Sequence, residues 1–273
     1  MVDAIKDVTF LCYLPNQSSD KIGCSADGLV SIGDKCRGTL RFDSHRLISF
    51  EEPTVESSFE YVHEPIITPD SFNRNLMTKM TEWFDTSHVL YFQSDGFIQN
   101  TGGWANDFLD YDYIGAPCLK PSSIRHAKDV QRILISGKMY EDYPGVMWVG
   151  NGGFSLRSKK YCDVANKLWQ ILPESHRLVN EDILANLVYR EYMKRNGVKV
   201  APIDVAFRFS TEHLAPNFEL YTQSFGFHEI GRFRTHVNYT NQNPFDWCMS
   251  LEQNHAIRAY REYLVKHSVV NKY

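Results

Sequence analysis

The sequence predicts an α/β protein with a single domain over residues 1–273. Two observations support this prediction. Short apolar runs, such as those at 8–13 and 89–92, alternate along the chain with segments of helical periodicity. In addition, no repeat, low-complexity tract or linker divides the chain, and a length of 273 residues is compatible with one domain. An uninterrupted apolar run is typical of a strand buried inside a sheet.

The N-terminal half of the chain is predicted to hold three strands and two helices. The strands at 8–13 and 89–92 are short apolar runs. In the second helix apolar residues recur at every fourth position, and Asp70 or Ser71 can cap its start. In chain order these elements are strand 8–13, helix 25–32, strand 46–50, helix 71–84 and strand 89–92.

The C-terminal half continues the alternation after a loop-rich stretch at 99–150. Ser158 can cap one helix, and Gly197 ends the next. The last helix carries its apolar residues on one face. In chain order these elements are strand 113–114, strand 146–149, helix 159–172, helix 180–196, strand 198–202 and helix 251–267, the last within a C-terminal segment at 240–273.

Composition and charge exclude several classes of protein. The 43% of hydrophobic residues excludes a disordered chain, and a net charge of −4 argues against a nucleic-acid binder that works by neutralising phosphates. The sequence contains no run of 18 apolar residues, so it predicts no membrane span. The N-terminal residues do not have the pattern of a signal peptide. The six cysteines form no CxxC pair, which favours reduced thiols. We therefore expect a cytoplasmic protein.

The first candidate for chemistry is Gln93-Ser94-Asp95-Gly96, at the end of a buried strand. Ligands bind at this position in α/β sheets. A carboxylate followed by glycine can hold a hard divalent cation and let a diphosphate approach the backbone. Taken alone, Ser-Asp-Gly is also ordinary turn chemistry, and the spacing by itself favours the turn.

The second candidate is Gly150-Asn151-Gly152-Gly153. Three glycines in four residues remove side chains where something approaches the backbone closely. The segment lacks both GxGxxG and the P-loop pattern. Two interpretations stay open: a tight turn between a strand and a helix, or a site where Asn151 and backbone amides contact sugar hydroxyls.

The third candidate is the carboxylate pair Glu181-Asp182 after Asn180. At a helix start such a pair often interacts only with the helix dipole, and in isolation this interpretation is favoured. The alternative is a general base whose neighbouring carboxylate raises or shares its proton affinity.

The fourth candidate is His228, in the sequence Phe225-Gly226-Phe227-His228. A histidine between aromatic residues is commonly a core or capping residue. Its imidazole can also be a metal ligand.

The order of these segments along the chain is a more specific signal of function than any one segment. This order resembles that of the GT-A class of glycosyltransferases. Fringe and β1,3-galactosyltransferase-like enzymes show the same succession. The closer resemblance is to an uncharacterised glycosyltransferase-like family, over about residues 60–230. The matching stretches are FQSDG at 92–96, FLDYDYIGAP at 108–117, VGNGGFSLRS at 149–158, NEDI at 180–183 and SFGFH at 224–228.

This resemblance implies a single GT-A (Rossmann-like) domain, with a mixed, mainly parallel sheet flanked by helices. Residues 1–60 match weakly and would hold the nucleotide base. The implied function is metal-dependent transfer of a sugar, with inversion, from a nucleotide-sugar donor to a hydroxyl of a glycan or glycolipid, as in polysaccharide biosynthesis. Two alternatives are a nucleotide-sugar hydrolase or nucleotidyltransferase, and a non-catalytic glycan-binding module.

The resemblance also implies roles for individual residues. Asp95 and His228 would bind Mn²⁺ or Mg²⁺, while Gln93 takes the place of the first Asp of a full DxD motif. Asp182 would be the base, with Glu181 as the second candidate. In a structural alternative Asp182 caps the helix and Glu181 faces the pocket. The implied substrate-binding residues are Gln93, Ser94, Asp112, Asn151, Gly152 and Gly153.

Overall fold

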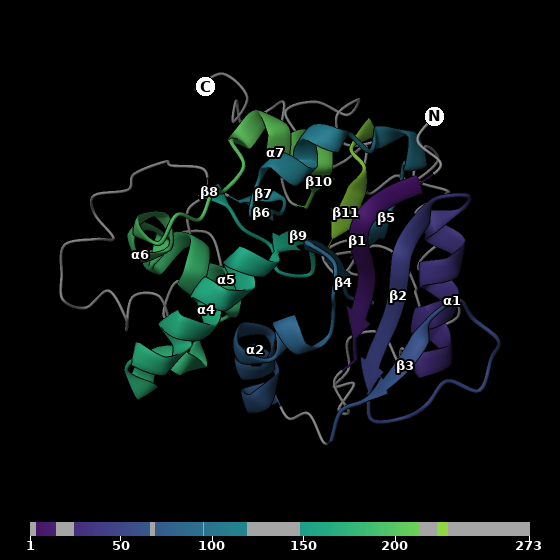
Figure 1. Ribbon diagram of the computed structural model, residues 1–273, viewed down its shortest axis with the longest axis horizontal. Coiled ribbons are helices and arrows are strands. Elements are labelled where there is room, and N and C mark those ends of the chain that lie inside the picture. The colour runs from purple at the N-terminus through teal and green to yellow at the C-terminus, as the bar shows by residue number, and fades with distance from the viewer. Residues whose placement is uncertain are drawn as a thin grey trace, which may run out of the picture.

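The centre of the protein is a six-stranded mixed sheet, seen in a computed structural model that describes residues 4–14, 25–65, 69–94, 96–118, 148–212 and 223–228 (Figure 1). The strand order is β3-β2-β1-β4-β9-β6. Neighbours among β1 to β4 are parallel, whereas β9 runs antiparallel to both of its neighbours. The bounds are β1 Ala4–Tyr13, β2 Arg41–Ser49, β3 Glu60–His63, β4 His88–Phe92, β6 Tyr113–Ile114 and β9 Phe154–Ser158. The predicted α/β class with a mainly parallel sheet is confirmed.

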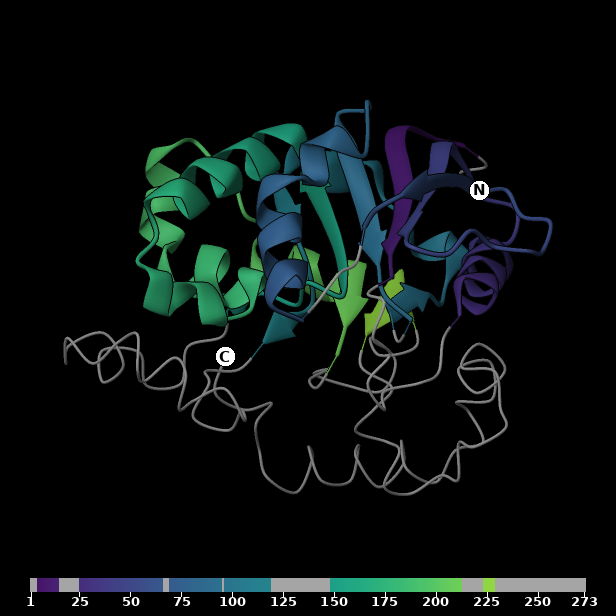
Figure 2. The same ribbon diagram turned by 90° about the horizontal axis from the view of Figure 1, so that it is seen from below.

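Helices flank this sheet, with α1 at one side and α2 and α4 grouped at the other (Figure 2). The α-helices are α1 Ala26–Arg37, α2 Pro69–Thr78, α4 Lys159–Ile171, α5 Glu181–Ile183, α6 Arg190–Arg195 and α7 Ile203–Phe209. The 3₁₀-helices are η1 Met80–Glu82, η2 Thr101–Gly103, η3 Asn106–Asp110 and η6 Glu174–Leu178. Element η7, Leu184–Val188, is a π-helix. No helix in these parts of the chain is long and apolar enough to cross a membrane.

Two small sheets complete the described structure. The first has the order β10-β11-β5, in which β11 is parallel to β10 and antiparallel to β5. The second pairs β7 with β8. The bounds are β5 Gly96–Ile98, β7 Pro117–Cys118, β8 Trp148–Val149, β10 Ser210–Thr211 and β11 Gly226–His228.

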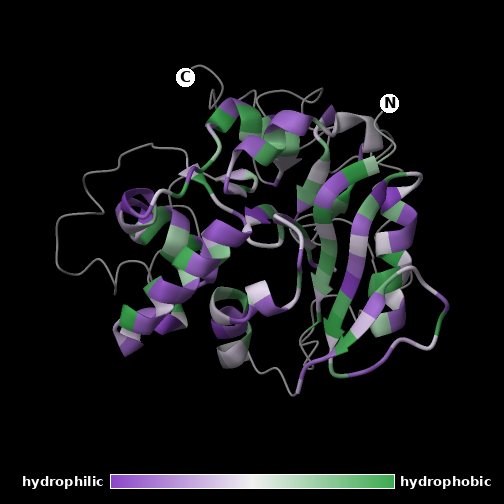
Figure 3. Ribbon diagram, in the orientation of Figure 1, coloured by the Kyte–Doolittle hydropathy of each residue, from purple (hydrophilic) through white to green (hydrophobic). Residues whose placement is uncertain are grey.

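The apolar runs that predicted strands do form the middle of the sheet. All five residues of β4 are buried, and the hydrophobic colour follows the central strands (Figure 3). Phe10 of β1 stacks between Phe42 and Phe92, with ring centroids at 4.9 and 4.4 Å. Burying each such ring contributes roughly 1.5–3 kcal/mol, so the sheet centre is a rigid base for the residues at its edges.

Two helix starts follow local capping chemistry, and a third does not. Ser25 accepts a hydrogen bond from the Gly28 amide at the start of α1, which continues to Arg37. Ser158 caps α4 as predicted, accepting from the Tyr161 amide. Helix α2 begins at Pro69, so Asp70 and Ser71 lie inside its first turn and the predicted cap is wrong. Proline is common at the first position of a helix because its fixed φ is close to the helical value.

Three further predictions differ from the structure or fall outside it. The predicted helix 180–196 is divided into α5, the π-helix η7 and α6, although it does end before Gly197, whose φ is +79°. Instead of a strand at 198–202, the structure has one bridge between Val200 and Tyr113. The predicted helix 251–267 lies outside the described residues.

Strand β9 is not among the strands that the sequence predicts: 154–157 follows the glycine-rich segment, for which a tight turn and a sugar-binding site both stay open. Its residues alternate apolar and polar, yet all five are buried, including Ser155 and Arg157. Polar residues on a strand normally face water. The alternation of apolar and polar residues in β9 therefore does not indicate a strand that is buried on both faces. What makes burial acceptable here is a partner for each polar group, and those partners belong to the site described next.

Candidate active site

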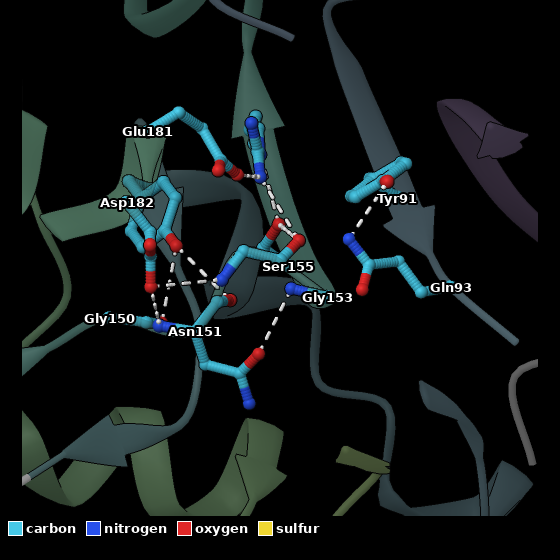
Figure 4. Close-up of polar contacts among 11 residues, drawn as sticks. Tyr91, Gln93, Gly150, Asn151, Gly153, Ser155, Glu181 and Asp182 are labelled. Atoms are coloured by element: carbon cyan, nitrogen blue, oxygen red, sulfur yellow. Dashed lines mark hydrogen bonds and ion pairs between the residues drawn. The ribbon is translucent and has the colours of Figure 1, made fainter. Parts of the chain in front are cut away.

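Gln93 and the glycine-rich turn at 150–153 meet at one edge of the main sheet (Figure 4). Phe92 ends β4 and pairs with Phe154, the first residue of the antiparallel β9. One step further, the Gln93 amide donates a hydrogen bond to the Gly153 carbonyl at 2.8 Å. This is the carboxyl edge of the parallel strands, where ligands bind in such sheets.

Asp182 holds the glycine-rich turn by its backbone amides. Its Oδ2 accepts hydrogen bonds from the amides of Asn151 at 2.9 Å and Gly152 at 3.3 Å. Asn151 has a φ of +66°, a conformation that asparagine tolerates better than most residues. Its side-chain Oδ1 accepts from the Gly153 amide at 3.0 Å, which closes the turn on itself. Asp182 therefore lies against the turn, not over the start of its own helix.

Arg157 holds the same turn from the other side. Its Nη2 donates to the Gly152 carbonyl at 3.0 Å and to Glu181 Oε1 at 2.9 Å, and its Nε donates to Ser155 Oγ at 2.9 Å. Arg157 is 1% exposed and Glu181 is 4% exposed, so this ion pair is fully desolvated. Because both charges are also hydrogen-bonded, the pair meets the condition under which a buried ion pair is tolerated.

Tyrosine rings surround this cation. The Arg157 guanidinium lies over the rings of Tyr91 and Tyr113, at 5.1 and 5.8 Å from their centroids. The Tyr113 hydroxyl also donates toward the carbonyls of Gly150 and Asn151, each at 3.2 Å. The backbone of the turn is thus held by donors and acceptors from β6, β9 and α5.

The two adjacent carboxylates differ in environment. Glu181 is buried and paired with Arg157, whereas Asp182 keeps partial exposure. Burial raises the pKa of Asp182 to about 7, and the negative charges of Glu181 and Glu212 act in the same direction, against the Ile183 amide and the positive charge of Arg157, which lower it. A carboxyl group in this state is half protonated near neutral pH, which is the condition of a general acid or base.

His228 reaches the same edge through the small sheet. It pairs with Gly96 across β5 and β11, and its ring packs against two glycines. A Cβ on Gly96 would lie 2.9 Å from His228 Cδ2, and a Cβ on Gly153 would overlap the ring at Nε2. On its other side, His228 Nδ1 lies 3.5 Å from Glu212 Oε1. These two glycines are therefore needed to make room for the imidazole.

Other residues expected in the site are placed elsewhere or not described. Asp112 lies at the opposite edge of the sheet, beside Ser158, which pairs with the first residue of β4. There it accepts from the Lys199 amide and forms an ion pair with Lys160, each at 2.7 Å. Asp95 lies outside the described residues, so its role stays a prediction.

Sequence reasoning missed two residues of this site. Arg157 was visible inside the GNGGFSLRS stretch, but only the burial of its strand gives it a role. Glu212 carried no local signal: it follows Thr211 at the end of β10, and only the pairing of β10 with β11 brings it beside His228.

One family match agrees with the extent of the motif region. The family described as a protein of unknown function, DUF5672, matches residues 56–228, and the chain belongs to this family. Among solved structures, the chain is similar to the apo form of the glycosyltransferase GlyE from Streptococcus pneumoniae TIGR4, at 12% identity and a TM-score of 0.45. That similarity covers 98% of this chain and 64% of the GlyE chain. No curated protein matches the sequence.

Proposed function

We propose that this protein is a GT-A class glycosyltransferase that depends on Mn²⁺ or Mg²⁺. It moves a sugar from a nucleotide-sugar to a hydroxyl of a glycan or glycolipid, with inversion. One observation carries the proposal: the carboxyl group of Asp182 is held at the carboxyl edge of the sheet by the glycine-rich turn, with its pKa raised to about 7. The motif order of the sequence supports the same conclusion.

Asp182 is assigned the role of base. A sugar hydroxyl is a poor nucleophile at neutral pH, and a base is most effective when its pKa lies near the working pH. Both backbone amides bond to Oδ2 of Asp182, so Oδ1 is assigned to the acceptor hydroxyl. Glu181 is less suited to this role because its charge is already paired with Arg157.

Asn151 and Gln93 are assigned to sugar hydroxyls. Asn151 is 4% exposed, and its Nδ2 has no hydrogen-bond partner among the described residues. A buried donor without a partner costs about 1–3 kcal/mol, which a ligand hydroxyl would recover. The side-chain amide of Gln93 donates to the Tyr91 hydroxyl at 3.2 Å, which orients it at the same edge.

Two side chains at this edge, His228 and Glu212, support the binding of a divalent cation. Gly96 and Gly153 leave the space that the His228 imidazole fills, and His228 faces a carboxylate through Nδ1. Imidazole nitrogen and carboxylate oxygen are both ligand types for such a cation. Asp95 and His228 would hold it, and when bound it supplies positive charge that stabilises the leaving diphosphate.

The test measures product formation with a panel of nucleotide-sugars and simple glycan acceptors, in Mn²⁺ and in EDTA. Asp182→Asn is expected to lower kcat by roughly 10²–10⁴ while donor affinity stays near wild type. Glu181→Gln is compared in parallel, and Asp163→Asn, on the exposed face of α4, is the matched control. NMR of the product reads the anomeric configuration.

Several outcomes would overturn parts of this proposal. Full activity of Asp182→Asn, or a product that keeps the donor anomer, would remove the base mechanism. Release of free sugar at the same rate with and without acceptor would indicate a hydrolase. Glycan binding without any turnover would indicate a binding module, and full activity in EDTA would exclude dependence on a metal.

A further inference from the structure

Glu212 and His228 lie next to each other at one end of the three-stranded sheet. Thr211, the last residue of β10, pairs in parallel with Phe227 of β11, and Glu212 and His228 are the residues that follow them. His228 in turn pairs with Gly96 of β5. The 3.5 Å between Glu212 Oε1 and His228 Nδ1 shows that the two side chains meet at this end of the small sheet.

The packing of the imidazole selects one of its nitrogens. The Nε2 edge of His228 lies against Gly153, whose missing Cβ would overlap it. The other nitrogen, Nδ1, faces Glu212 Oε1 at 3.5 Å, with 14% of the histidine side chain and 11% of the glutamate side chain exposed. The Nδ1 nitrogen and the carboxylate therefore share one nearly dehydrated space.

The 3.5 Å separation lies close to that of two ligands of one cation. Adjacent donor atoms ~2.1 Å from an octahedral cation lie about 3.0 Å apart, so a movement of roughly 0.5 Å would bring both atoms into its coordination shell. The charge distribution agrees, since the negative charge of Glu212 is felt at Asp182. A cation near Glu212 would offset this concentration of negative charge at the sheet edge.

We propose that Glu212 Oε1 and His228 Nδ1 together bind the divalent cation, with Mn²⁺ favoured over Mg²⁺. This inference rests on the proposed function and adds a ligand that no motif indicates. The preference follows from the donor set, because imidazole nitrogen suits transition metals, whereas Mg²⁺ prefers oxygen ligands in a strict octahedron.

The test measures Mn²⁺ binding to the substrate-free protein by the EPR signal of free Mn²⁺, independently of turnover. Glu212→Gln and His228→Gln are each expected to weaken binding by at least about tenfold, the size of effect known for residues of metal sites. Glu64→Gln is the matched control: Glu64 is also buried and ion-paired, with Lys79 at 2.5 Å, but belongs to another part of the fold. Circular dichroism confirms folding, and Glu212→Asp, which keeps the charge, is expected to bind with intermediate affinity.

The outcomes separate this inference from the proposed function. Wild-type Mn²⁺ affinity in Glu212→Gln would show that Glu212 only pairs with His228, and would overturn the inference. Absence of Mn²⁺ binding in the wild type would overturn it as well, while sugar transfer in EDTA is measured separately. A wild-type protein that binds Mn²⁺ through Glu212 but transfers no sugar would refute the proposed function and leave the ligand pair intact.

Discussion

Glu181 and Asp182 are neighbours in sequence with opposite environments. Successive helical residues diverge by ~100°, so the two carboxylates cannot face the same partner. Glu181 turns toward the buried Arg157, and Asp182 toward the amides of the glycine-rich turn. The charge of Glu181 is therefore balanced by an ion pair inside the protein, while Asp182 lies at the sheet edge with a pKa of about 7.

The first prediction at this scale concerns pH. If Asp182 is the base, only its ionised form acts, so kcat/KM should fall about tenfold per pH unit below pH 7 and level off above it. In Glu181→Gln the midpoint should move to lower pH, because a negative charge that raises the Asp182 pKa is removed. The measurement is the pH–rate profile of both proteins, and an unchanged midpoint would contradict the assigned coupling.

A second prediction concerns the glycines of the turn. Neither Gly152 nor Gly153 has a positive φ, so the cost of a side chain comes from overlap: with Glu181 at Gly152 and with His228 at Gly153. Each Gly→Ala change is expected to lower the free energy of unfolding by about 1–3 kcal/mol. Gly102→Ala is the control, since its Cβ would lie 3.4 Å from Asn100 Oδ1. Urea unfolding measures all three, and equal stabilities would refute the overlap argument.

At the scale of elements, β9 and the helix that begins with α5 are joined by a charge pair. Arg157 comes from the centre of the sheet, and its guanidinium reaches both Glu181 and the turn before its own strand. Beyond this point the helix passes through a π-helical turn, with the Tyr189 amide bonded to the Leu184 carbonyl. Such wider turns are often found at functional sites.

The third prediction tests this junction. Arg157→Met leaves Glu181 buried without a partner and is expected to cost about 3–5 kcal/mol in the free energy of unfolding. Adding Glu181→Leu should recover a large part of that loss, because the double variant buries no charge. Arg208→Met is the control: Arg208 pairs with Asp107, but both are about half exposed, so a loss of roughly 0–1 kcal/mol is expected. Additive losses in the double variant would argue against a coupled pair.

The whole molecule brings two sheets to one site. The six-stranded sheet supplies Gln93 and the glycine-rich turn, and the three-stranded sheet supplies Glu212 and His228. Burial on this scale also affects titratable groups far from the site. His45, packed among aromatic rings, and His88, at the start of β4, both have pKa values lowered by burial.

The fourth prediction follows from these two histidines. A histidine with a lowered folded-state pKa contributes stability that is fully present above its unfolded value of about 6.5 and is lost as pH falls through the folded value. The contribution of these two histidines to the free energy of unfolding should therefore decrease between pH 7.5 and pH 5.5, whereas Asp182, whose pKa is raised to about 7, changes stability in the opposite direction over this range. His45→Phe is expected to reduce this loss, because it removes a titrating group and suits the surrounding aromatic rings. Urea unfolding at both pH values measures it, and identical losses in the two proteins would contradict it.

Much of the fold could be predicted from the sequence where a local pattern and burial coincide. The buried runs of β1 and β4 are apolar except for Thr9 and His88, so their place inside the sheet could be predicted from composition. The start of α4 follows from one capping serine. Strand β9 could not be predicted in this way, because the partners that let Arg157 be buried come from another element.

The candidate site divides along the same line. The sequence by itself determined which segments carry chemistry, because glycines, carboxylates and histidine are recognisable by type and order. Only the tertiary structure decided which of these residues lie together. Asp112 lies at the opposite edge of the sheet, and Glu212 lies beside His228. The tertiary structure also decided which of Glu181 and Asp182 forms an ion pair with Arg157. The physical reason is that strand register and a distant charge set a side chain's neighbours, and neither is written in the residues next to it.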